Sequence, residues 1–163
     1  MKALVLEGTD GLASAVVTDI DPPTAKAHEV LVAVKAAGLN HRELWIARGQ
    51  YPGMVAAPFS MGCDAAGVID SVGDGVDEQR IGEEVVLYPG LNWGPDPRFP
   101  AANFATLGMP GPGTIAEKIA VRATSALPKP AHLSFDQAAA IGRCSPTTTF
   151  ANDLHLLKPR LKF

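Results

Sequence analysis

A run of polar residues, Asn40-His41-Arg42-Glu43, follows an apolar segment in the first third of the chain. Asn40 stands directly after a predicted buried strand and at a predicted helix start, where asparagine is a good N-cap. One interpretation is therefore structural, with Asn40 as the cap and the next three residues as ordinary first-turn residues. The other is a pocket-lining amide that holds a substrate oxygen. The sequence leaves both interpretations open.

Cys63 and Asp64 form a second candidate, because together they offer the donor types of half a metal site. A zinc site needs three or four ligands that converge from different segments. A single buried cysteine is more often a small hydrophobe than a ligand, which favours a core position over a metal site. The histidines that could complete a ligand set are scattered along the chain: His28, His41, His132 and His155.

The segment Gly111 to Ala116 fits the G-x-G-x-x-A pattern of dinucleotide-binding turns. The surroundings do not suit that function, since no apolar parallel strand precedes the segment and residues 115–122 alternate with strand period. Pro112 also lacks the backbone N–H that would donate a hydrogen bond to a phosphate. We therefore expect a turn that enters a strand, and no cofactor-binding residues in this chain.

The elements that must position these residues are short strands joined by Gly- and Pro-rich connections. This pattern predicts a mainly β fold, either a small barrel or a sandwich. Two short helices are expected, one over residues 41–48 that ends at Gly49 and one that starts with a Ser134–Gln137 capping box and reaches Ile141. Residues 143–163 read as a tail docked on the barrel. The strands are predicted at residues 2–7, 29–35, 67–72, 84–88, 115–122 and 125–127.

The chain has 163 residues and a formal net charge of −3, with 47% hydrophobic residues. This length suits one domain with a real core. The absence of a basic cluster argues against nucleic-acid binding, and no apolar run approaches the roughly 20 residues that span a bilayer. The N-terminal apolar stretch is too short for a signal peptide, and Cys63 and Cys144 make no disulfide framework. These features predict a cytoplasmic protein with no membrane partner.

Four stretches in order resemble the N-terminal, GroES-like catalytic domain of medium-chain dehydrogenases/reductases. This family includes zinc alcohol dehydrogenases and zinc-independent quinone oxidoreductases. The resemblance covers residues 1–141 and implies a β-rich α+β fold, a partly open barrel with two or three short helices. The stretches are residues 22–32, 36–43, 62–76 and 113–117, and residues 133–140 close the set.

The resemblance also implies roles for individual residues. Zinc-binding members carry cysteine where this chain has Asn40, and a His-Glu pair where it has Cys63-Asp64, so these are degenerate zinc positions and zinc is not expected. In quinone-reductase-like members a pocket asparagine matches Asn40, an acidic residue matches Glu43 and a tyrosine matches Tyr51. The expected catalytic residues are therefore Asn40, Glu43, Tyr51 and Asp64, although family members with the asparagine usually carry aspartate at the Glu43 position.

The resemblance implies an NAD(P)H-dependent oxidoreductase that moves a hydride to or from a carbonyl, quinone-like or activated-alkene substrate. Family members continue into a Rossmann domain that holds the cofactor, NAD or NADP. This chain leaves the family pattern near Ile141, so we expect no Rossmann domain in it and a divergent tail over residues 142–163. Hydride transfer then requires a partner that supplies a nucleotide-binding domain, and the chain by itself is expected to be inactive.

Two further functions are compatible with the same fold. A non-enzymatic binding or dimerisation module would use the cleft face that the missing domain leaves exposed, either for self-association or for a partner. A co-chaperonin would share only the barrel, and no segment resembles a mobile chaperonin-binding loop. Loops such as residues 91–105 would determine the substrate.

Overall fold

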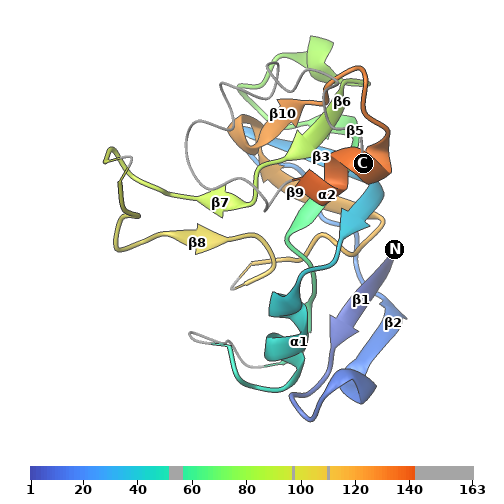
Figure 1. Ribbon diagram of the computed structural model, residues 1–163. Coiled ribbons are helices and arrows are strands. Elements are labelled where there is room, and N and C mark those ends of the chain that lie inside the picture. The colour runs from blue at the N-terminus through green and yellow to red at the C-terminus, as the bar shows by residue number, and fades with distance from the viewer. Residues whose placement is uncertain (52–56, 97, 110, 142–163) are drawn as a thin grey trace.

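Five antiparallel strands make up the largest sheet of the chain, and two smaller sheets extend from it (Figure 1). The structure is a computed structural model that describes residues 1–51, 57–96, 98–109 and 111–141. The strands are β1 Lys2–Leu6, β2 Ala15–Asp19, β3 Glu29–Gly38, β4 Phe59–Ser60, β5 Asp64–Val72, β6 Glu84–Leu87, β7 Gly90–Leu91, β8 Ala105–Thr106, β9 Lys118–Arg122 and β10 Ala126–Pro128. The helices are α1 His41–Ala47 and α2 Phe135–Ile141, and 3-10 turns cover Leu12–Ser14, Glu78–Arg80 and Ala123–Ser125.

The strand order is β10-β6-β5-β3-β9 in the large sheet and β2-β1-β4 in the second. A bridge between Ala3 and Ala116, with a hydrogen bond from the Leu4 N–H to the Ile115 carbonyl (2.8 Å), links the two sheets. The sheets do not close into a full cylinder. The predicted mainly β, partly open barrel with short helices is confirmed.

The core follows the alternation of the predicted strands. Val30 and Val32 of β3 are fully buried, and Ile119 and Val121 of β9 point into the same cluster. The neighbouring Arg122 is exposed, as expected for a strand with one charged face. Neither described helix has the length and apolar composition needed to cross a bilayer.

The second helix begins as its sequence predicts. The Ser134 N–H donates to Gln137 Oε1 at 3.0 Å, and the Gln137 N–H donates to Ser134 Oγ at 3.2 Å. This reciprocal pair is the predicted capping box. Ala138 and Ala139 of α2 are buried against Ala66 and Val86, so a helix of two turns is stabilised by packing on the large sheet.

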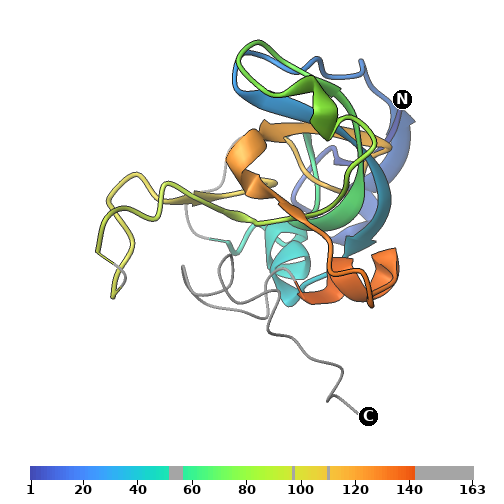
Figure 2. The same cartoon turned by 90° about the horizontal axis from the view of Figure 1, so that it is seen from above.

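Some elements differ from the sequence prediction. β2 is not among the strands predicted from the sequence, and the structure leaves its Val17 71% exposed. It forms because β1 supplies a hydrogen-bonding partner along its whole length. β7 and β8 pair at the base of an arm that projects from the barrel in both views (Figures 1 and 2). The predicted tail over residues 143–163 lies outside the described residues.

The G-x-G-x-x-A match is a turn, as predicted. The Gly113 N–H donates to Ser60 Oγ at 2.7 Å, and the Ile115 N–H donates to the Met61 carbonyl at 2.9 Å. These bonds hold the turn against β4, and the chain continues into β9 with no intervening helix. All strand pairs among the described residues are antiparallel, so the described part of the chain contains no βαβ unit.

Candidate active site

Asn40 lies between the end of β3 and the start of α1. It occupies the N-cap position, with φ −120° and ψ 157°. Its backbone N–H donates to Glu43 Oε2 at 2.9 Å, so the glutamate side chain returns to the start of its own helix. α1 ends at Ala47 with Arg48 as its C-cap, and the next residue, Gly49, has a φ of 67°, the left-handed conformation expected after a helix.

The side-chain amide of Asn40 contacts the first residues of β5. Its Nδ2 donates to Asp64 Oδ2 at 2.6 Å and to Cys63 Sγ at 3.4 Å. The residues meet because β3 and β5 pair in an antiparallel register that places Gly38 opposite Asp64. Asn40 therefore has the structural role of the helix N-cap, and its amide is directed at two other candidate residues.

Cys63 is fully buried and packs with Val30, Val32 and Leu87 of the main core. Its thiol accepts a long hydrogen bond from the Asn40 amide. The described residues contain no group of three or more His, Cys, Asp or Glu side chains that could hold a metal ion. Asn40 also directs N–H bonds, not an electron pair, towards Cys63 and Asp64. An asparagine amide is not among the Cys, His, Asp and Glu ligands that typically bind zinc.

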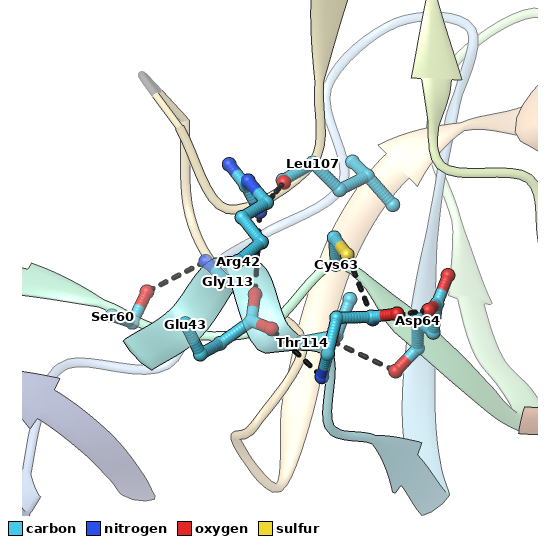
Figure 3. A network of polar contacts seen from close by, with 9 residues as sticks. Arg42, Glu43, Ser60, Cys63, Asp64, Leu107, Gly113 and Thr114 are labelled. Atoms are coloured by element: carbon cyan, nitrogen blue, oxygen red, sulfur yellow. Dashed lines mark hydrogen bonds and ion pairs between the residues drawn. The ribbon is translucent and has the colours of Figure 1, made fainter. Parts of the chain in front are cut away.

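Arg42 and Glu43 are buried, and the interpretation of both as ordinary first-turn residues is wrong. Their side chains are 3% and 5% exposed, and Arg42 Nη1 lies 3.4 Å from Glu43 Oε1. Nη1 also donates to the Leu107 carbonyl at 3.1 Å, which ties α1 to the segment after β8 (Figure 3). The two bonds of Nη1 offset part of the cost of burying this charge pair, whereas Nε and Nη2 of Arg42 make no hydrogen bond among the described residues.

Tyr51 stands beside the helix, with its ring 5.0 Å from the guanidinium carbon of Arg42. A pocket of about 310 Å³ opens here. The expected residues Asn40 and Tyr51 both line the pocket, whereas Glu43 and Asp64 are outside its lining and form hydrogen bonds with Asn40. The lining residues are Asn40, His41, Arg42, Trp45 and Tyr51.

Two residues that contribute to this site were not singled out in the sequence. Arg42 shares a helix face with the buried Ile46 four residues later, and this spacing is the signal that could have placed it inside. Thr114 is fully buried, and its Oγ1 donates to the Asp64 carbonyl at 2.9 Å (Figure 3). Only tertiary contact reveals Thr114, since fifty residues separate it from Asp64.

Comparison with known proteins places this geometry in a family context. A quinone oxidoreductase from Mus musculus is 32% identical over 77% of this chain, and the match spans 32% of its own length. The zinc-type alcohol dehydrogenase-like protein YogA of Leptosphaeria maculans is 31% identical over 78% of this chain and 38% of its own. The chain thus spans less than half the length of these curated relatives.

The fold has close counterparts among solved structures. A crystal structure of an NAD-dependent alcohol dehydrogenase superposes with a TM-score of 0.80 and is 36% identical, and the match covers 87% of this chain and 43% of that one. Residues 26–131 match the alcohol dehydrogenase GroES-like domain family. This match covers more than half of the sequence and includes the site from Asn40 to Thr114. The chain belongs to the alcohol dehydrogenase GroES-like domain family.

Proposed function

We propose that this chain provides the substrate-binding and catalytic part of a NAD(P)H-dependent oxidoreductase. The reaction is hydride transfer to or from a small carbonyl compound, a quinone or an activated alkene. The observation that carries the proposal is the pocket lined by Asn40 and Tyr51, in a domain of a family whose relatives include quinone oxidoreductases and alcohol dehydrogenases.

Hydride addition to a carbonyl leaves negative charge on the oxygen, and the site must stabilise that charge with hydrogen-bond donors. We assign this role to the Tyr51 hydroxyl and to the Asn40 N–H that contacts Cys63. Sulfur is a weak acceptor and the contact is long, at 3.4 Å, so a substrate oxygen can take this hydrogen. The shorter bond to Asp64, at 2.6 Å, keeps the amide in place meanwhile.

Glu43 and Asp64 act as positioning residues in this proposal. Glu43 binds the backbone N–H of Asn40, and Asp64 binds its side-chain amide. Thr114 fixes the backbone at Asp64. Asn40 is therefore supported by a layer of buried polar groups, which is the arrangement that preorganised catalysis requires.

The nicotinamide cofactor supplies the hydride when it is bound. The described residues do not fit a dinucleotide, since their strands are all antiparallel and no βαβ unit surrounds the glycine-rich turn. The cofactor therefore has to be held by a nucleotide-binding domain outside the described residues. A partner that supplies this domain completes the site.

Mixing the chain with the nucleotide-binding half of a full-length relative tests the proposal. Quinone and enone substrates are added with NADH or NADPH, and nicotinamide absorbance is followed. Turnover should require both proteins and should fall by about a hundredfold in Asn40→Ala. A complex that forms and stays inactive with every substrate class overturns the proposal.

A second function, as a binding module, is favoured by two exposed apolar side chains near the pocket. Leu39, just before the N-cap of α1, is 77% exposed, and Trp45, within α1, is 49% exposed. Exposed apolar side chains mark an interaction site where they form one continuous patch, and the binding-module function requires that these two do so. Sedimentation equilibrium of the wild type and of Leu39→Ser tests this function, which requires an association that the substitution weakens.

A further inference from the structure

Arg42 is buried with one edge of its guanidinium group unpaired. Its Nη1 donates to the Leu107 carbonyl and faces Glu43, whereas Nε and Nη2 have no hydrogen-bond partner in the part of the chain that the structure describes. Nη1 lies on the Cδ side of the group, so Nε and Nη2 form the opposite edge. The N–H bonds of this edge run parallel, and the edge pairs with both oxygens of a carboxylate.

Arg80 shows how a structural arginine of this fold is bonded. Its Nε donates to Glu83 at 2.7 Å, Nη1 to the Ala123 carbonyl at 2.9 Å and Nη2 to the Ala126 carbonyl at 2.8 Å. All three nitrogens are satisfied, although the side chain is 25% exposed. Arg42 is more deeply buried and has fewer partners. Unpaired buried donors cost free energy, so a purely structural role does not account for Arg42.

The unpaired edge belongs to a residue that lines the candidate pocket. Arg42 lines the pocket together with Asn40 and Tyr51, the residues that we assign to the substrate. The Tyr51 ring covers the guanidinium face. Nε and Nη2 are shielded from solvent in this arrangement, so a ligand reaches them when the Tyr51 ring shifts. The Glu43 carboxylate lies beside Nη1, so it compensates the charge of the guanidinium group on that side and not at the Nε–Nη2 edge.

We propose that the Nε–Nη2 edge of Arg42 binds a carboxylate of the substrate. The substrate class is then carbonyl or alkene compounds that bear a carboxylate, such as enoic acids and oxo acids. A planar carboxylate matches the two parallel donors, and it satisfies both of them at once. The substrate assignment rests on the proposed oxidoreductase function, whereas the binding of the carboxylate does not.

The test compares crotonate with crotonamide, which has nearly the same shape and no charge. Binding to the full chain is followed by heteronuclear NMR through the Arg42 Nε–H resonance, which is assigned by its loss in Arg42→Lys. Crotonate should bind at least about tenfold more tightly than crotonamide and shift the Nε–H resonance. Equal binding of the two probes, or crotonate binding without this shift, overturns the proposal.

Two variants separate the site from general effects of charge. Arg42→Lys keeps the charge and removes the paired edge, and it should weaken crotonate binding by about tenfold or more. Arg80→Lys is the matched control, and it should leave binding unchanged. If Arg42→Lys does not fold, the crotonate and crotonamide titrations of the wild type decide. Pyrophosphate serves as a further probe, and preferential binding of pyrophosphate at Arg42 would assign the edge to a cofactor phosphate and refute the carboxylate proposal.

Failure of the binding test and failure of the turnover test have different outcomes and can be distinguished. Carboxylate binding at Arg42 with no turnover in the two-protein assay refutes the oxidoreductase function and leaves the anion site. Turnover of neutral quinones with no preference for crotonate over crotonamide refutes the role of Arg42 and leaves the oxidoreductase function. A preference for carboxylate substrates that disappears in Arg42→Lys supports both.

Discussion

The amide nitrogen of Asn40 lies 2.6 Å from the carboxylate oxygen Oδ2 of Asp64, and this bond joins the first turn of α1 to the first residue of β5. Both residues are also held from other directions. Glu43 binds the backbone N–H of Asn40, and Thr114 binds the backbone carbonyl of Asp64. Residues from three separate parts of the chain therefore fix the geometry of one amide.

Asn40→Asp places two carboxylates in contact and should make stability depend on pH. Aspartate remains a good N-cap, so the change tests the contact with Asp64 and not the helix start. The repulsion raises the pKa of the pair above that of an unfolded carboxyl, so the folded state binds more protons and loses stability as pH rises. We expect a loss of about 1–3 kcal/mol at about pH 8 and a smaller loss at about pH 5.

Urea denaturation of wild type and variant at the two pH values measures this effect. The double variant Asn40→Asp with Asp64→Asn is the control, because it restores one amide and one carboxylate in exchanged positions. It should recover part of the lost free energy of unfolding. Equal stability of Asn40→Asp at both pH values would contradict the contact.

Thr114→Val should lower the free energy of unfolding by about 1–2 kcal/mol. The substitution conserves the side-chain shape and leaves the Asp64 carbonyl without the hydrogen bond from Thr114 Oγ1. Thr114→Ser keeps the hydroxyl and loses only a methyl group, so it serves as the control. Chemical denaturation measures the free energy of unfolding of both variants. A serine variant less stable than the valine variant would show that packing, and not the hydrogen bond, determines stability at this position.

Gly67→Ala should destabilise the chain by about 2 kcal/mol or more. A Cβ at this position of β5 would overlap the carbonyl oxygen of Ala33 on β3, and backbone of a central strand has little room to move. Gly111→Ala is the matched control, since a Cβ there meets no atom within 4 Å. Thermal unfolding should separate the two variants clearly, and similar melting temperatures would mean that the β3–β5 spacing is wider than described.

Lys2→Gln should raise the pKa of Asp19 towards its ordinary value. Lys2 Nζ lies 2.5 Å from Asp19 Oδ2, and this hydrogen bond lowers the pKa of the carboxyl. A lowered pKa stabilises the fold above the pKa of the unfolded group, and the contribution is lost as the pH falls through the folded pKa. Both side chains are mostly exposed, so the effect on stability near neutral pH should be small.

An NMR titration of the Asp19 carboxyl measures the shift. Lys35→Gln removes the same charge from an exposed site on β3, and it should leave the Asp19 pKa where it is in the wild type. A pKa that moves equally in both variants would point to overall charge as the cause and not to the Lys2 hydrogen bond.

The sequence by itself determined the features that depend on neighbouring residues. The Ser134–Gln137 capping box, the alternation of β9 and the end of α1 just before Gly49 all follow from residues a few positions apart. Such signals act through local backbone geometry, so they can be read along the chain. The ordered motifs also indicated the family, and with it the expected site residues Asn40 and Tyr51 that line the pocket.

Only the tertiary structure decided the features that need a distant partner. β3 continues past the predicted end to Gly38, and β5 begins at Asp64, because each strand supplies hydrogen bonds to the other. The burial of Arg42 depends in the same way on the Leu107 carbonyl, sixty-five residues away. A charged residue in a first helical turn is usually solvated, and its place inside is set by acceptors that the local sequence does not contain.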